Sequence, residues 1–189
     1  MASILSHPAV VLGLGPAFGY PARPRRIWLA GAACAVAPDI DAVGHWLGVP
    51  YGSLFGHRGL THSLPFAAAL ALGLTLGLFG HSAEEGSFLR IFLFLFLCAA
   101  SHGVLDSMTD GGRGVAFLAP FDPERFFLPW RPIRVSPIGT RGFFGARGVA
   151  ILESEAVWIW APALAVGAAA LSIRKLVSQN GTEPSRRSS

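Results

Sequence analysis

Long stretches of apolar residues organise this sequence. Four of them stand out: Ile27 to Pro38, Gly59 to Ala83, Ile91 to Leu105 and Ala156 to Ile173. A helix that spans a membrane needs about 20 predominantly apolar residues, with a range of about 17 to 25. The second and fourth stretches meet this length, and the third meets it if Arg90 reaches the membrane surface. We expect the shorter first stretch to form a partly buried helix or half of a hairpin.

The segment between Leu105 and Glu153 differs from these stretches in amino-acid composition. It is rich in Gly, Pro, Phe and Arg, and this frequency of Gly and Pro breaks long helices. We expect an ordered surface segment with turns, whose aromatic rings can lie at the level of the lipid headgroups. The pattern as a whole predicts an all-α integral membrane bundle of about 3 to 5 helices. We expect one domain over residues 1–177 and a disordered tail over 178–189.

Composition supports the membrane assignment. Apolar residues make up 52% of the 189 residues and charged residues only 14%, against roughly 25% in soluble domains. The net charge is +4, and 14 of the 15 basic residues are Arg. These Arg residues flank the apolar stretches instead of forming one basic stripe, so we expect contact with membrane lipid and no nucleic-acid partner. The predicted location is the bacterial inner membrane, and the oligomeric state stays open.

The charge pattern leaves the membrane topology unsettled. We expect Arg23, Arg25 and Arg26 at the face of the candidate site, together with Arg58 and the Arg residues between 106 and 153. The positive-inside rule then makes that face cytoplasmic. The basic pair that follows the last apolar stretch would then reach the opposite face. Either that stretch does not span the membrane or the charge rule fails here.

Ionisable residues at the ends of the apolar stretches are candidates for function. Asp39 and Asp41 follow Pro38, and two close carboxylates repel each other unless a cation or a proton lies between them. The alternative is a turn in which one of them caps a helix. His45 lies four residues after Asp41 and can join such a site.

Histidines supply the other candidates. His57 and His62 lie in HRGLTHS, just before the longest apolar stretch, and His102 and Asp106 are spaced i, i+4 on one face of a predicted helix. Imidazole nitrogen and carboxylate oxygen are ligands that zinc accepts. His7 can approach from the N-terminal segment, although an isolated histidine there is more simply exposed.

Topology brings these candidates together. The second and third stretches form an antiparallel hairpin, so the residues entering it and those leaving it lie at the same membrane face. Glu153 and Glu155 precede the last stretch at that face, where acidic residues also simply favour a helix N-terminus. The roles of Glu153, Glu155, His45 and Asp110 stay open.

These motifs resemble those of the YdjM-like membrane-bound metal-dependent hydrolases. The resemblance rests on His7, PDID at 38–41, FGHRGLTHS at 55–63 and SHGVLDSMTDGG at 101–112, and it covers about residues 5 to 175. It implies hydrolysis at a divalent-metal site, most simply one or two zinc ions. The metal ligands it implies are His7, Asp39, Asp41, His57, His62, His102 and Asp106. A more distant resemblance links the family to zinc-dependent phospholipase C and related nucleases, although this chain lacks their later HxxxE helix.

The expected reaction is metal-assisted hydrolysis of a phosphoester or lipid-like substrate at the membrane edge. Asp39 or Asp41 would accept the proton of the attacking water, and Arg58, or Arg113 in the loop segment, would hold a phosphate. The alternative is a non-catalytic metal-binding scaffold or carrier. A carrier places its ligands near the bilayer midplane, whereas these candidates lie at helix ends.

Overall fold

Apolar sequence and small residues build a bundle of long helices. In the computed structural model, residues 1–20, 25–80, 85–138 and 143–180 are described. The α-helices are α1 (Val10–Ala17), α2 (Arg25–Val36), α3 (Ala42–Trp46), α4 (Leu64–Leu74), α5 (Glu85–Ser107), α6 (Ala146–Glu155) and α7 (Ala161–Asn180). Short 3-10 helices, η1 (His7–Ala9), η2 (Ala37–Asp41) and η3 (Leu60–His62), and π-helical segments, η4 (Thr75–Phe79) and η5 (Ala156–Trp160), extend or join these helices into longer rods.

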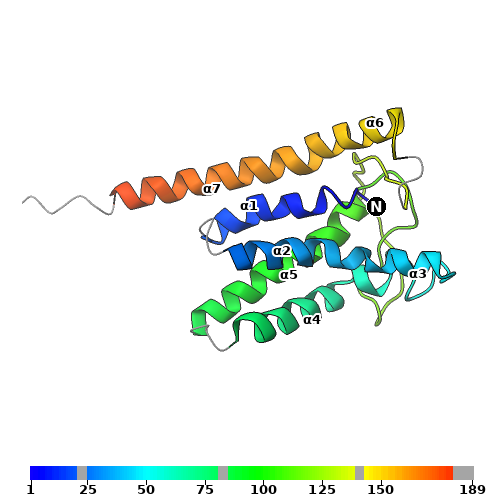
Figure 1. The fold of residues 1–189 in the computed structure, drawn as a ribbon, viewed down its shortest axis with the longest axis horizontal. Coiled ribbons are helices and arrows are strands. Elements are labelled where there is room, and N and C mark those ends of the chain that lie inside the picture. Colours follow the sequence, from blue (N-terminus) through cyan, green and yellow to red (C-terminus); the bar gives the residue numbers. More distant parts are fainter. Residues whose placement is uncertain (21–24, 81–84, 139–142, 181–189) are drawn as a thin grey trace, which may run out of the picture.

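The rods lie side by side along the long axis of the molecule (Figure 1). α2 and α4 both pack on α5, and α1 packs on α7. The described residues contain no β-strand beyond two isolated bridges, so the predicted all-α membrane bundle is confirmed. The core between the rods is formed by buried residues such as Cys34, Ala71 and Phe94.

Glycine permits a close contact between α1 and α7. A Cβ atom on Gly13 would lie 2.9 Å from the carbonyl oxygen of Ala163, and one on Gly167 would lie 2.3 Å from that of Leu12. Small residues at helix interfaces let backbones approach in lipid, where no hydrophobic force drives helices together. These two glycines therefore determine how closely the last rod docks.

Within the described residues, three rods are long and apolar enough to cross a membrane, namely Arg25–Trp46, Ser87–Ser107 and Ala146–Asn180. The third and fourth apolar stretches were predicted to span, and they lie in two of these rods. The first stretch forms a partly buried helix, as expected, but it is longer than expected. It continues through η2 and α3 into a rod of 22 residues, because the Pro38 turn keeps the helical direction. The expectation that the second stretch is long enough to span was wrong. The second stretch gives only the shorter apolar helix Leu64–Phe79, because residues 59–63 belong to the loop and η3.

The segment after α5 folds over one end of the bundle. The amide of Ala116 donates to the carbonyl of Arg58, and the amide of Leu64 donates to that of Phe117. Isolated bridges pair Thr109 with Ile133 and Val115 with Phe126, while Val115 and Ile133 are fully buried. The segment is thus ordered, as expected, and it closes the end of the bundle at which α2 and α5 terminate.

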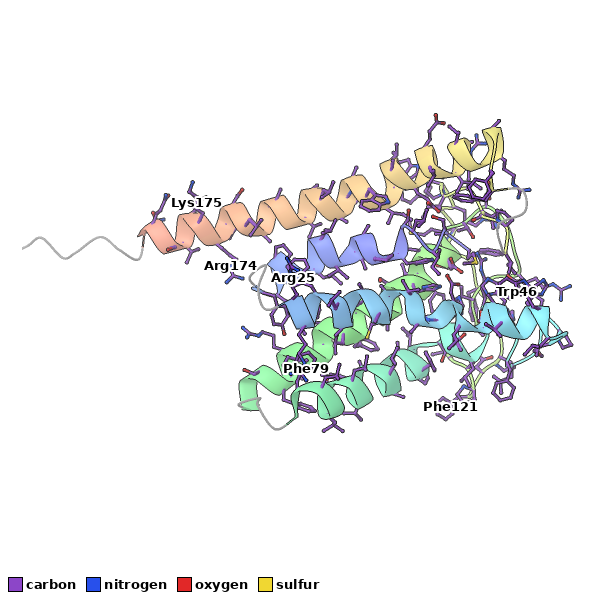
Figure 2. All side chains as sticks on the ribbon, viewed as in Figure 1. Arg25, Trp46, Phe79, Phe121, Arg174 and Lys175 are labelled. Atoms are coloured by element: carbon purple, nitrogen blue, oxygen red, sulfur yellow. The ribbon has the colours of Figure 1, made fainter. Side chains whose placement is uncertain are left out.

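The two ends of the bundle carry different groups (Figure 2). Trp46 and Phe121 lie at the end covered by this segment, and Arg25, Phe79, Arg174 and Lys175 lie toward the other. The assignment of Arg25 and Arg26 to the face of the candidate site was therefore wrong, because the 12 residues of α2 separate them from PDID. Arg23 and residues 181–189 of the predicted tail lie outside the described residues, and residues 178–180 continue α7.

Candidate metal centre

All seven predicted ligands meet at the end of the bundle where α2 terminates. η1 supplies His7, η2 supplies Asp39 and Asp41, the loop before α4 supplies His57 and His62, and α5 supplies His102 and Asp106. All seven are buried, with exposed fractions from 0 to 7%. They form two groups able to hold a metal ion, one of Asp39, Asp41, His57 and His62 and one of His7, His102 and Asp106.

Asp41 orients two of the histidines. Its Oδ1 accepts a hydrogen bond from Nδ1 of His57 at 2.7 Å, and its Oδ2 lies 3.1 Å from Nδ1 of His62. The same Oδ2 accepts from the hydroxyl of Thr61 at 2.6 Å and from the amide of Arg58 at 3.2 Å. A carboxylate that holds Nδ1–H directs the Nε2 lone pair outward, which is how metal-binding histidines are positioned.

His102 is oriented in the same way from another element. Its Nδ1 donates to the backbone carbonyl of Ala35 at 2.8 Å, so its Nε2 carries the lone pair. That Nε2 lies 3.1 Å from Nε2 of His62 and 3.3 Å from Oδ1 of Asp39. The ring of His7 stacks on His102, with centroids 3.6 Å apart. Several nitrogen and oxygen atoms with available lone pairs therefore face one small volume.

Asp106 ties the two groups together. Its Oδ2 accepts from Nε of Arg58 at 3.0 Å and lies 3.6 Å from Nε2 of His62. Its Oδ1 accepts from the amide of Ala2 at 2.7 Å and lies 3.6 Å from Nε2 of His7. A carboxylate with one oxygen toward each group is placed to bridge them.

Arg58, in the HRGLTHS loop, connects this loop to three residues in and after α5 through hydrogen bonds. It is fully buried, and its backbone adopts φ 65, in the left-handed region that side-chain-bearing residues rarely occupy. Besides Asp106, its guanidinium donates to the carbonyl of Gly111 at 2.9 Å and to the hydroxyl of Thr109 at 2.8 Å. Three of its five N–H groups are thus held by the protein, leaving one on each terminal nitrogen.

The histidines outside the spanning rods show opposite electrostatic effects. Burial lowers the pKa of His7 to about 4, and burial also lowers the pKa of His57 despite its bond to Asp41. Burial opposes protonation of His62 too, but the carboxylates of Asp106 and Asp41 outweigh it and raise its pKa to about 9. A positive charge is therefore favoured between those two carboxylates, which is the position a cation would take.

Unpaired polar atoms support a bound cation. Both oxygens of Asp39, both ring nitrogens of His7 and Nε2 of His57 are buried without a hydrogen-bond partner. A buried polar group without a partner costs roughly 1–3 kcal/mol, and more when it is charged. Three carboxylates meet here, while the buried guanidinium of Arg58 contacts only one of them. The donor set, which mixes imidazole nitrogen with carboxylate oxygen, could therefore hold a divalent metal ion.

The structure separates other candidates from this centre. His45 is exposed on α3, and Asp110 is exposed and accepts from the amide of Val135 at 2.8 Å. Glu153 is exposed. Glu155 is fully buried, but its Oε2 accepts from the hydroxyls of Ser3 and Ser6 at 2.6 and 2.7 Å, so it anchors the N-terminal segment.

Sequence reasoning missed several supporting contacts. The carbonyl of Ala35 orients His102, and Arg125 donates to the carbonyl of His57 at 2.9 Å. The hydroxyl of Thr61 donates to Asp41, and Ser63 caps α4 by accepting from the amide of Phe66. Every residue has a backbone carbonyl, so the sequence gives no indication of which carbonyl orients a histidine. Of these contacts, only the one from the threonine in HRGLTHS involves a residue that the motif itself indicates.

Together, these observations define a helical membrane protein with a buried His/Asp cluster. The YdjM inner membrane protein family matches residues 1–177, and the chain belongs to this family. It is 38% identical over 164 residues to the inner membrane protein YbcI of Escherichia coli strain K12, an alignment that covers 87% of this chain and 94% of that protein. No solved structure matches the chain. The predicted family and inner-membrane location are confirmed.

Proposed function

We propose that this protein is a membrane-bound metal-dependent hydrolase acting on a phosphoester or lipid-like substrate. The observation that supports the proposal most strongly is the convergence of seven buried His and Asp residues in two groups. Nδ1 of His57 and of His102 donates to a protein oxygen, so the Nε2 atoms are available as ligands. Selection for the stability of an apolar bundle alone would not gather three buried carboxylates, one of them without a hydrogen-bond partner, in its interior.

The residues of the cluster would have different roles in metal binding. His57, His62 and His102 hold the metal through Nε2, and Asp106 links the two groups. When bound, a divalent ion lowers the pKa of a coordinated water and polarises a phosphoryl oxygen. Zinc is the metal we propose, as one or two ions.

Asp39 is the better candidate for the proton acceptor. The two oxygens of Asp41 are occupied by His57, Thr61 and the amide of Arg58, whereas neither oxygen of Asp39 has a hydrogen-bond partner. One oxygen of Asp39 can thus hold metal while the other accepts a proton from water.

Arg58 acts first as a positioning residue, because its Nε orients Asp106. Phosphate binding by Arg58 stays a prediction, and it would use the free N–H on each terminal nitrogen. The exposed Arg113 is the other candidate for this role. The distant resemblance to zinc-dependent phospholipase C likewise stays a prediction.

Metal content and turnover test the proposal together. We expect the purified wild-type protein to contain about one to two equivalents of zinc by elemental analysis and to hydrolyse a phosphodiester or phospholipid until a chelator is added. His62→Ala and His102→Ala should each lower metal affinity by at least about tenfold and abolish turnover. His45→Ala is the matched control, because His45 is exposed and outside the cluster.

Two results would contradict the proposal. A metal-free wild-type protein whose stability is unchanged by His62→Ala and His102→Ala would rule out a metal centre. Bound metal without turnover on any phosphoester would favour the non-catalytic scaffold or carrier instead.

A further inference from the structure

A cleft leads from the surface of the molecule to the metal centre. Its volume is about 440 Å³, within the range of roughly 300–1,000 Å³ that is typical of small-molecule sites. The N-terminal segment, Asp39 of η2, Ala42 and Trp46 of α3, and residues 136–138 and 143–144 form its walls. Of the seven cluster residues, Asp39 lines this cleft, and its carboxylate oxygens are buried without a partner. Asp39 therefore separates the cleft from the buried histidines.

The rest of the cleft is mainly hydrocarbon. Leu5, Trp46 and Phe144 line it and are themselves 59%, 69% and 83% exposed. The hydroxyl of Ser3, one of the few polar groups in the walls, is already bonded to Glu155. Because most of the wall is apolar, the cleft offers a polar ligand such as a sugar or a nucleotide few hydrogen bonds, but it can bury an alkyl chain.

The position of the cleft agrees with this occupant. Trp46 ends the rod Arg25–Trp46, and Figure 2 shows it at the same end of the bundle as Phe121. Exposed tryptophan and aromatic rings at the end of a spanning rod are typical of the membrane–water interface. The linkage between headgroup and alkyl chain in an amphiphile lies at this same depth. The cleft is also too small for a helix of another protein chain, which would need a groove along a whole helical face.

We propose that this cleft binds the alkyl chain of an amphiphilic phosphoester and so places the ester beside Asp39. The substrate class is therefore an amphiphile with one hydrocarbon chain in the cleft and its phosphate toward the cluster. This inference rests on the proposed function, because it concerns the substrate of the same centre. It adds that chain length, in addition to the phosphate, determines affinity.

Chain-length dependence of binding tests this inference separately from catalysis. The probes are butyl phosphate and dodecyl phosphate, titrated by calorimetry against the full-length, zinc-loaded protein in lipid nanodiscs, with empty nanodiscs subtracted. We expect wild-type protein to bind dodecyl phosphate at least about tenfold more tightly than butyl phosphate. Phe144→Ser should weaken dodecyl phosphate binding by about tenfold and change butyl phosphate binding by less than about twofold.

Phe121→Ser is the matched control. Phe121 is 85% exposed, as Phe144 is 83% exposed, but it lies outside the cleft. We expect Phe121→Ser to bind both probes as the wild-type protein does. A second variant, Ala42→Phe, fills the cleft from α3 and should weaken dodecyl phosphate binding while the zinc content stays unchanged.

The outcomes distinguish the two proposals. Three results would each overturn the cleft assignment. The first is equal affinity of the wild-type protein for both probes, and the second is an equal loss in Phe144→Ser and Phe121→Ser. The third is no effect of Phe144→Ser and Ala42→Phe. Turnover of soluble phosphoesters would then still support the hydrolase. Conversely, chain-dependent binding without any turnover would retain the cleft and refute the hydrolase.

Discussion

The helical rods and the candidate metal centre, the two parts of this molecule, differ in which residues are exposed and which are buried. Along α7, Leu164, Leu171 and Ile173 are more than half exposed, whereas in the metal centre His7, Arg58 and Asp106 have no exposed surface. A soluble protein would reverse this distribution, because water favours exposed charge and buried hydrocarbon. The difference indicates that lipid surrounds the helical rods. Polar groups in such a protein must satisfy one another or a bound ion.

The two parts also hold together by different interactions. In the rods, close contact between small residues such as Gly13 and Gly167 replaces the hydrophobic effect. In the metal centre, charge-assisted hydrogen bonds such as Arg58 to Asp106 stabilise the loops. Substitutions in the two parts should therefore differ in both size and cause.

The largest loss of stability should come from Asp106→Asn. Asp106 accepts from Arg58 and from the amide of Ala2, so its neutralisation leaves a fully buried guanidinium without its charged partner. Breaking a buried ion pair costs about 3–5 kcal/mol. We expect a decrease of this size in the free energy of unfolding, measured by denaturant titration of metal-free protein in detergent.

Asp110→Asn is the control for that substitution. Asp110 is an exposed carboxylate four residues further on, and an asparagine oxygen can still accept from the amide of Val135. If the two variants unfold at the same denaturant concentration, the buried ion pair does not stabilise the metal centre.

An intermediate effect should come from the contact between α1 and α7. A Cβ on Gly167 would lie 2.3 Å from the carbonyl oxygen of Leu12, so Gly167→Val forces the two rods apart. Such overpacking typically costs about 1–3 kcal/mol. We expect a lower melting temperature in detergent and the same metal content as the wild-type protein, because the contact lies outside the candidate metal centre.

Gly73→Ala shows whether crowding is the cause. A Cβ on Gly73 in α4 has no neighbour within 4 Å, and alanine is preferred to glycine in a helix by about 0.5–1 kcal/mol. This variant should therefore be at least as stable as the wild-type protein. Equal destabilisation by both variants would contradict the close-packing explanation.

The smallest loss of stability should come from a substitution where the candidate metal centre meets the helical rods, at the start of α4. Ser63 accepts from the amide of Phe66 at 3.2 Å and caps α4, so Ser63→Ala should lower the free energy of unfolding by about 1 kcal/mol. Ser63→Asn restores a capping oxygen and should recover part of this loss if the buried position accommodates it. A Ser63→Ala variant as stable as the wild-type protein would show that the cap is dispensable.

Much of the candidate site could be predicted from the order of the motifs. His102 and Asp106 lie on one helix face because of their spacing, and antiparallel connection brings them to the level of His57 and His62. Helix lengths were predicted less well. Gly59 to Ser63 are as uncharged as the helix that follows, apart from His62, so hydropathy alone could not show that they form a loop.

The sequence by itself determined the helical membrane class and the identities of the residues that cluster. The length of the apolar stretches indicates the membrane class, and the His and Asp residues at the ends of those stretches indicate which residues cluster. Only the tertiary structure decided their separate roles. Asp39 and Asp41 are equivalent in PDID, yet the loop carrying His57 and Thr61 bonds Asp41 alone and leaves Asp39 beside the cleft. Those contacts join residues 16 and 20 positions apart through a folded loop, which no local spacing specifies.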